Sequence, residues 1–201
     1  MITIYKKLLG HFGPRNWWPA DTPFEVVIGA ILTQQTKWEN VEKAIRNLKA
    51  RGLLEAKQLA RADLEELEVL VRCTGFYRQK AKRLKDISNY FFENPDILKR
   101  PADDLRKTLL SLNGIGEETA DSIVLYAAEK PRFVIDAYTK RICGCMGLER
   151  NYGGLQAIFE GSLPQDVPLY KEFHALIVEY GKQFCGKKRC DECILVENSK
   201  M

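Results

Sequence analysis

The fold is decided by the stretch LLSLNGIGEETADSIVLYAAEKPRFVIDAYTKR, residues 109–141. Its first part predicts a helix, a turn over residues 113–116 and a second helix from Glu117 to about Glu129. Two glycines around one aliphatic residue suit a turn that needs positive φ or a close backbone approach, with Ile115 as the apolar pin between the helices. The stretch therefore predicts a helix-hairpin-helix, residues 109–129.

The turn leads straight into a helix, and this arrangement favours an anion. The N–H groups of residues 116–119 would point to solvent at the positive end of the helix dipole, where a phosphate fits without any side-chain charge. A plain helix–turn–helix corner is the alternative, and a lone GxG would favour it. Here, however, Val134-Ile135-Asp136 follows about twenty residues later and brings a carboxylate to the start of a further helix.

The hairpin and the sequence VIDAYTKRI together resemble the endonuclease III superfamily of DNA glycosylases. The resemblance implies that the hairpin grips the damaged strand and that Asp136 serves the chemistry. Without the other motifs, Asp136 would be read as the N-cap of the helix 137–145, because Asp accepts N–H bonds well at that position. One residue can do both. The hairpin residues expected to bind DNA are Gly114, Ile115, Gly116 and Thr119.

Composition is consistent with a packed globular protein. The chain has 201 residues, 45% of them hydrophobic, which permits one large domain or two small lobes. No apolar run reaches the roughly eighteen residues of a membrane span, and the N-terminus lacks a signal-peptide layout, so we expect an intracellular chain with no membrane partner. The resemblance to DNA glycosylases implies a cytoplasmic, nucleoid-associated protein, which we expect to be a monomer. The net charge of +4 permits a polyanionic partner, and basic residues cluster in two runs that are usually solvated faces. The runs contain Arg78, Lys80, Lys82, Arg83 and Lys85, and Lys187, Lys188 and Arg189.

Apolar residues recur at helical spacing along the chain, and no alternating strand pattern exceeds four residues, so the predicted fold is all-α. The helix 24–32 is apolar nearly all round and is therefore expected to be central. The superfamily arranges such helices as two lobes with the active cleft between them. This implies one lobe over about 22–130, and a second made of 1–21 and 131–201 with a cysteine-containing tail.

Two loops resemble parts of the superfamily that handle an extruded base. The polar loop after the central helix resembles its LxxQ-type loop, in which Gln35 matches the glutamine that fills the space left by the base. The stretch from Gly75 to Ala81 matches its GxYxxKA turn, in which Phe76 takes the position that wedges into the duplex. A capped helix with Tyr77 in the core is the alternative, but it does not explain a bulky aromatic residue beside Gly75.

Within the superfamily, the chain most resembles the third class of bacterial 3-methyladenine DNA glycosylases. Matching stretches are WWP (17–19), FEVVIGAILTQQTKWENV (24–41), GFYRQKAKRL (75–84), GIGEETAD (114–121), VIDAY (134–138) and FHALIVEYGKQ (173–183). The resemblance implies a base pocket built from Trp18, Trp38, Pro19 and Lys182. The chain departs from the class at Trp38, where the class has phenylalanine, and at Leu176, where it can have a second lysine.

The aromatic residues have alternative interpretations. The adjacent Trp17 and Trp18 cannot both face one core from one regular element, so at least one is expected to project into a cleft or a neighbouring loop. A hydrophobic plug is the alternative for this pair. Trp38 continues the apolar stripe of the helix 38–48 and would ordinarily be buried as core.

Cys185, Cys190 and Cys193 give the spacing C-x4-C-x2-C, which resembles the iron–sulfur loop of endonuclease III, C-x6-C-x2-C-x5-C. The first gap is two residues short and the fourth cysteine is missing, whereas a cubane cluster needs four ligands. Cys143 or Cys145 could supply one, although a small buried cysteine is the ordinary interpretation of both. We expect no required cofactor and a degenerate loop, with a [4Fe-4S] cluster or zinc as the alternative.

Glu118 decides the expected reaction. Bifunctional members place a lysine at this position of the hairpin, and without an amine there the remaining route is attack by water. Asp136 would stabilise the oxocarbenium-like sugar and orient the water, leaving an abasic site. The sequence thus predicts a monofunctional glycosylase that acts on damaged double-stranded DNA and removes an alkylated purine such as 3-methyladenine.

Two other functions stay open. An endonuclease III-like glycosylase and AP lyase for damaged pyrimidines is favoured by the cysteine tail and disfavoured by Glu118. A non-catalytic DNA-structure binder would need only the hairpin, so Asp136, Gln35 and the aromatic pair weigh against it.

Overall fold

A computed structural model describes residues 1–15, 17–148, 150–187, 189 and 192–195. Over these ranges the chain forms α-helices joined by short 3-10 and π-helical segments, with no β-strand, which confirms the all-α prediction. The helices are α1 (Ile2–Phe12), α2 (Pro23–Leu32), α3 (Trp38–Ala50), α4 (Ala56–Arg61), α5 (Leu64–Val71), α6 (Tyr77–Glu93), α7 (Ala102–Leu110), α8 (Glu117–Ser122), α9 (Ala137–Cys145), α10 (Tyr152–Ser162) and α11 (Val167–Tyr180). The 3-10 segments are Arg72–Thr74 and Ile97–Lys99, and the π-helical segments are Ile123–Ala127 and Gly181–Cys185.

The chain divides into two compact units, each with its own core. One consists of Met1–Trp18 and Glu129–Met201, and the other of Pro19–Ala128. The first unit is thus formed from both ends of the chain, and the second is a single continuous stretch. The boundaries expected from the sequence, residues 22 and 130, lie close to these divisions.

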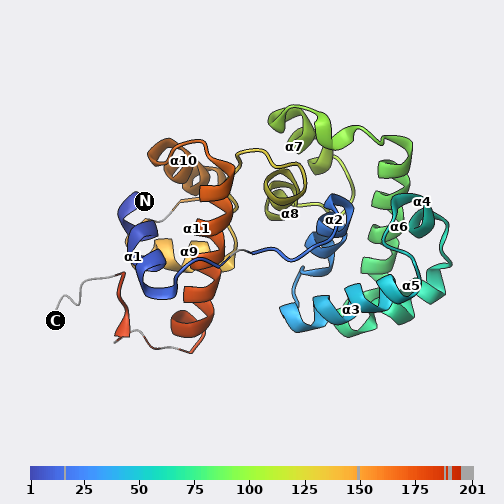
Figure 1. Ribbon diagram of the computed structural model, residues 1–201, viewed down its shortest axis with the longest axis horizontal. Coiled ribbons are helices and arrows are strands. Elements are labelled where there is room, and N and C mark those ends of the chain that lie inside the picture. The colour runs from blue at the N-terminus through green and yellow to red at the C-terminus, as the bar shows by residue number, and fades with distance from the viewer. Residues whose placement is uncertain (16, 149, 188, 190–191, 196–201) are drawn as a thin grey trace. The chain divides into compact units, whose positions relative to one another are not determined.

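The unit Pro19–Ala128 is built around α2, which lies among α3, α6 and α8 (Figure 1). Thr22 caps the helix and Pro23 occupies its first turn, so the start is fixed locally. Its residues Ile28, Ile31 and Leu32 are fully buried, each contributing about 1.5–3 kcal/mol by leaving water. Although α2 is so apolar, no helix within the described residues is long and apolar enough to cross a membrane.

The hairpin in this unit has the predicted form. Helix α7 ends at Leu110, and after the turn α8 continues as the π-helical segment Ile123–Ala127. Ile115 is buried, which confirms it as the apolar pin. Gly114 has φ +81°, and a Cβ there would lie 2.2 Å from the Nε of Arg83. Gly116 has φ −93° and open space around the Cβ position, so only the first glycine meets a backbone requirement.

Helix α6 corrects the expectation that its basic run is a solvated face. Arg78 and Lys82 are exposed, but Lys80 is buried at 1% exposure. Its position one residue before the buried Ala81, and four before the buried Leu84, places it on the inward face of the helix. A charge pattern alone did not reveal this, because the helical period decides which lysine faces the core.

The unit formed by both ends of the chain is built around α11, which packs against α1 and α9 (Figure 1). Aromatic rings fill its core. Phe133 stacks on Phe159 of α10 with ring centroids 4.1 Å apart, and meets Tyr170 and Phe173 of α11 edge-on at 5.5 and 5.6 Å. Because Phe133 opens the segment that leads to Asp136, this packing fixes the approach to the start of α9.

Candidate active-site and DNA-contact residues

Asp136 lies at the N-terminus of α9, directly after the fully buried Val134 and Ile135. Its Oδ1 accepts hydrogen bonds from the backbone N–H and the hydroxyl of Thr139, both at 2.7 Å. The residue is therefore the N-cap of the helix, as the alternative interpretation expected. The cap uses one carboxylate oxygen, and the other faces a different neighbour.

That neighbour is His174 of α11, whose Nε2 lies 3.8 Å from the Oδ2 of Asp136. Burial lowers the pKa of His174, and the charge of Asp136 opposes this shift. With its pKa lowered from 6.5, the imidazole is neutral at neutral pH, so it leaves the negative charge of Asp136 in place. This histidine was not predicted from the sequence. The available signal was one histidine, of two in the chain, directly before the apolar run Ala175–Val178.

The tryptophan pair joins the same cluster. Trp17 stacks on Trp18 with ring centroids 5.8 Å apart and an interplanar angle of 24°, and on His174 at 5.8 Å and 23°. Both tryptophans are half-buried, so neither is a fully buried plug. Trp17 thus contacts the histidine beside Asp136 and also stacks on Trp18. Pro19, which follows, is exposed and opens the other unit.

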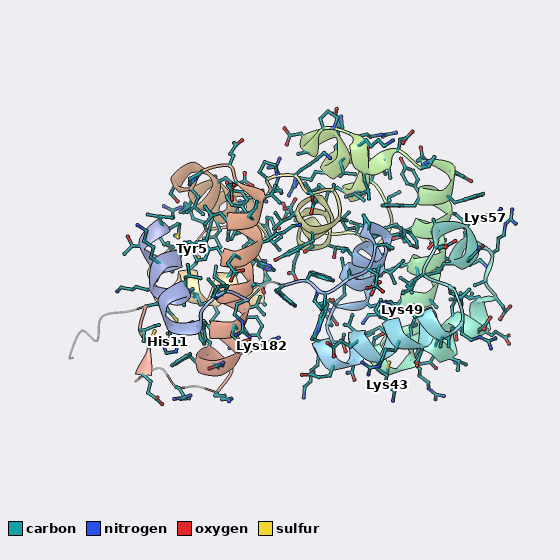
Figure 2. The ribbon with its side chains drawn as sticks, viewed as in Figure 1. Tyr5, His11, Lys43, Lys49, Lys57 and Lys182 are labelled. Atoms are coloured by element: carbon teal, nitrogen blue, oxygen red, sulfur yellow. The ribbon has the colours of Figure 1, made fainter. Side chains whose placement is uncertain are left out.

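Lys182, labelled in Figure 2, lies in the π-helical segment after α11, with its Nζ 5.8 Å from the Trp17 ring centroid. The two residues help to line a cavity of about 150 Å³. The structure thus brings Lys182 to Trp17, whereas the predicted base pocket contains Trp18. Leu176 is fully buried, so this departure from the 3-methyladenine class belongs to the core of α11.

Gly181 opens the segment that carries Lys182, and it allows a close approach of α9. A Cβ at this position would lie 2.3 Å from the Tyr138 ring, so any larger residue would push the ring away. Tyr138 follows Asp136 by two residues. The close contact therefore ties the start of α9 to the end of α11.

Trp38 is the first residue of α3 in the unit Pro19–Ala128. It is half-buried, and its indole N–H donates to the Oε1 of Glu42 at 2.9 Å. The alternative interpretation of Trp38 as a buried core residue does not hold, because the buried side of α3 begins at Val41 and continues with Ala44 and Leu48. At the helix start, the Trp38 ring keeps a solvent-accessible part.

Gln35 and Phe76 share an uncommon backbone conformation. Gln35 has φ 52° and Phe76 has φ 46°, in the left-handed region that residues other than glycine rarely adopt. Both side chains are exposed, and Phe76 is 61% exposed. The exposed ring of Phe76 makes no core packing that would offset the strain of its backbone. This supports a role for the ring in contact with another molecule.

Gln34, which the sequence analysis passed over, contacts the hairpin. Its Nε2 donates to the carbonyl of Gly114 at 3.0 Å and to the hydroxyl of Thr119 at 3.1 Å. Its Oε1 accepts a hydrogen bond from Arg83 at 2.7 Å. Thr119 is buried and turns its hydroxyl toward Gln34, so its expected contact with DNA remains a prediction.

The first turn of α8 is acidic. Glu118, at the position where bifunctional enzymes carry lysine, is exposed, and Glu117 pairs with Arg106 at 3.5 Å. Arg106 also binds the fully buried Asp121 at 2.6 Å. This ion pair secures α8 to α7 within the hairpin.

Among the residues whose structure is described, the cysteine tail does not assemble a complete set of metal ligands. Cys190 lies outside them, and Cys193 accepts a hydrogen bond from the hydroxyl of Tyr180 at 2.9 Å. Burial raises the pKa of Cys143 to about 11, which disfavours the thiolate that a metal needs. Over the described ranges, no three His, Cys, Asp or Glu side chains are placed to hold a metal. Metal binding by Cys185, Cys190 and Cys193 stays the alternative to the expected degenerate loop.

Comparison with known proteins gives a consistent result over most of the chain. Residues 28–158 match the HhH-GPD superfamily of base excision DNA repair proteins. A proposed DNA repair glycosylase of Methanocaldococcus jannaschii is 50% identical over 204 residues, covering 96% of this chain and 93% of the relative. Endonuclease III of Thermotoga maritima is 33% identical over 186 residues, covering 90% of this chain and 84% of the relative.

A solved structure resembles the chain in both sequence and fold. It is the 3-methyladenine DNA glycosylase of H. pylori bound to 1,N6-ethenoadenine, with 34% identity and a TM-score of 0.77. The match covers 90% of this chain and 96% of that one. The similar proteins thus include both an endonuclease III and a 3-methyladenine DNA glycosylase.

Proposed function

Because the chain belongs to the HhH-GPD superfamily of base excision DNA repair proteins, we propose that it is a monofunctional glycosylase that removes an alkylated purine such as 3-methyladenine. The family makes it a DNA glycosylase of base excision repair, whose partner is DNA. The choice of base and the use of water as the nucleophile are the parts that we propose.

The observation that carries the proposal is that the two carboxylate oxygens of Asp136 have different neighbours. One oxygen is held by Thr139, so the carboxylate is fixed in place. The other faces a buried neutral imidazole, which leaves its charge available. A fixed carboxylate can stabilise the positive charge that develops on the sugar as the glycosidic bond breaks, and can take a proton from the attacking water.

Glu118 supports hydrolysis over strand cleavage. A lyase reaction requires an amine that forms a Schiff base with the sugar, and a carboxylate at this position of α8 cannot do so. Water then remains as the nucleophile. The product is an abasic site in an unbroken strand, which a later enzyme of the repair sequence must cut.

Aromatic faces support an alkylated purine as the base. Methylation at N3 places a delocalised positive charge on adenine, and indole rings attract such a charge by stacking and cation–π interaction. We assign Trp18 and Trp38 as the stacking residues, Pro19 as a wall and Lys182 as a further pocket residue. The half-exposed ring of Trp38 and the stacking of Trp18 on Trp17 are compatible with this role.

For the DNA itself, we propose that the hairpin binds phosphates while Gln35 and Phe76 enter the duplex at the extruded base. The supporting observation is that both side chains are exposed on left-handed backbone. The hairpin contacts involve Gly114, Ile115, Gly116 and Thr119. Binding to double-stranded DNA by a monomer completes the proposal.

One alternative has a specific observation in its favour. The cysteine tail and the 33% identity to endonuclease III of T. maritima favour a glycosylase and lyase for damaged pyrimidines. The two enzymes differ in both base and product, so one assay separates them.

The test is incubation of the protein with duplexes that each carry one lesion, including 3-methyladenine, 1,N6-ethenoadenine and thymine glycol. Released base and strand breaks are scored before and after alkali. We expect release of the alkylated purine and breaks only after alkali. Release of thymine glycol with breaks before alkali would establish the alternative, and no release from any duplex would favour a non-catalytic DNA binder.

A further inference from the structure

Lys80 of α6 binds the two segments that precede Gln35 and Phe76, the two residues with left-handed backbone described above. Its buried Nζ donates to the carbonyls of Leu32 and Thr74, both at 2.8 Å. Leu32 ends α2, where helical carbonyls lack partners, and it leads into the loop that carries Gln35. Thr74 directly precedes Gly75 and Phe76. One ammonium group therefore fixes the starting points of both loops.

Arg83, about one helical turn further along α6, makes the corresponding connection to the hairpin. Its Nη1 donates to Gln34 at 2.7 Å, and Gln34 donates in turn to Gly114 and Thr119. Arg83 also lies against the backbone of Gly114, in the space that a Cβ would occupy. Gln34 thus binds Arg83, 49 positions away in the chain, and Gly114, 80 positions away.

These bonds explain how strained residues stay in place. A left-handed conformation is unfavourable for a residue with a side chain, so Gln35 and Phe76 need their surroundings to hold them. Each follows within three residues a carbonyl that Lys80 binds, and Gln34 precedes Gln35 directly. We call Gln34, Lys80 and Arg83 together the α6 brace.

We propose that the α6 brace holds Gln35, Phe76 and the hairpin at fixed separations, so that gripping the strand and extruding the base occur as one event. The inference rests on the proposed function, which assigns DNA contacts to those three parts. The members of the brace are positioning residues and need not touch the base. Their loss should therefore impair extrusion more than binding.

The main test replaces Arg83 with methionine, which keeps an apolar stem and removes the bonds to Gln34. Lys82→Met is the matched control, because it removes the same charge from an exposed neighbour on α6. We expect single-turnover base release by Arg83→Met to fall by at least about tenfold, as displacement of a positioned group does, while affinity for undamaged duplex stays within a few-fold of the control.

Extrusion is then measured directly in the Asp136→Asn background, where no base is lost. A 2-aminopurine beside the lesion brightens when its neighbour leaves the stack, and Arg83→Met should reduce that signal. An unpaired target base needs less energy to leave the stack, so it should restore most of the release by Arg83→Met with Asp136 intact. A variant that is merely less stable would lose activity on paired and unpaired targets alike.

Amide hydrogen exchange of the free protein tests the brace without DNA. Arg83→Met should raise exchange in residues 33–36 and 113–119 together, whereas Lys82→Met should change neither segment. Gln34→Leu removes the hydrogen bond to Arg83 together with those to Gly114 and Thr119, and it replaces Arg83→Met if that variant does not fold. If wild-type protein releases no base from any lesion, the proposed function fails, and the exchange result decides the brace alone.

The inference is overturned if Arg83→Met matches Lys82→Met in base release, extrusion and exchange while the wild type remains active. It is also overturned if release from paired and unpaired targets falls equally. The inference is supported if amide exchange rises in both segments together and base release falls on paired targets but not on unpaired ones.

Discussion

Asp136 caps α9 through one carboxylate oxygen, and the proposed function gives its negative charge a role in the chemistry; a substitution can separate the two. Asp136→Asn keeps a side-chain oxygen to cap α9 through Thr139 and removes the charge that the chemistry needs. We therefore expect base release to be abolished while duplex binding stays within a few-fold and the free energy of unfolding changes little. Single-turnover assays, gel-shift titration and urea unfolding measure these three quantities.

The control for Asp136 is Asp136→Ala, which removes both the charge and the cap and should cost about 1 kcal/mol of stability. If Asp136→Asn instead released base at a rate near that of the wild type, Asp136 would be a helix cap and nothing more.

His174 predicts a dependence of stability on pH. Burial lowers its pKa, so on acidification the unfolded chain takes up a proton that the folded protein resists. The stability that the neutral imidazole contributes is present above pH 6.5 and is lost as pH falls below it. Relative to His174→Phe, which keeps a ring against Trp17, the wild type should lose up to about 1.4 kcal/mol per pH unit.

Urea unfolding of both proteins at a series of pH values from neutral to acidic measures this difference. His11→Phe, at the only other histidine of the chain, controls for the loss of an exposed histidine. Equal slopes for wild type and His174→Phe would show that the buried imidazole is protonated as readily as a free one.

At the scale of elements, the hairpin without a lysine predicts the outcome of a trapping experiment. No amine at Glu118 means no Schiff base, so borohydride should trap no covalent adduct and strands should break only after alkali or heat. Glu118→Lys supplies the amine and should give weak trapping. A strong adduct with the wild type would mean that another lysine, such as Lys182, reaches the sugar.

Helix α6 predicts a titration at mildly alkaline pH. Burial, and secondarily the charge of Arg83, lower the pKa of Lys80 to about 8. Between that pH and the usual value of 10.5, the folded protein has released a proton that the unfolded chain still binds. The wild type should therefore gain stability relative to Lys80→Met as pH rises through this interval, and Lys82→Met should not differ from the wild type in its slope.

Urea unfolding at both ends of this pH interval, with an NMR titration of the lysine side chains, provides the measurement. The resonance that is missing from Lys80→Met should titrate near pH 8. A midpoint above pH 10 would show that the ammonium is as well solvated as an exposed one.

For the molecule as a whole, what the sequence could predict was local. The helices, the hairpin with Ile115 and the central place of α2 follow from periodicity, glycines and Pro23, which act within a few residues. Lys80, Gln34 and His174 were not predicted in their roles because their partners lie 48, 80 and 38 positions away. Periodicity gives the face of a helix, but it does not say which backbone carbonyl a buried cation will meet.

The proposed choice of base depends on residues of both units. Trp18 lies in the unit that carries Asp136, and Trp38 lies in the unit that carries the hairpin. If both rings stack on a cationic methylated purine, each contributes about 1–3 kcal/mol. A neutral oxidised pyrimidine has a smaller ring and no charge, and gains less. Methylation also weakens the glycosidic bond, so one carboxylate can suffice without an acid for the leaving group.

Trp18→Ala and Trp38→Ala should therefore each reduce release of 3-methyladenine by about tenfold or more, since 1.4 kcal/mol corresponds to a factor of ten. Affinity for undamaged duplex should be unchanged, because in the proposed pocket the rings contact only an extruded base. Trp18→Phe and Trp38→Phe keep an aromatic face and should retain most of the activity. Release rates on 3-methyladenine and thymine glycol, measured for all five proteins, decide the matter. Equal activity on thymine glycol, or indifference to both alanine substitutions, would exclude the alkylpurine pocket and favour a pyrimidine glycosylase.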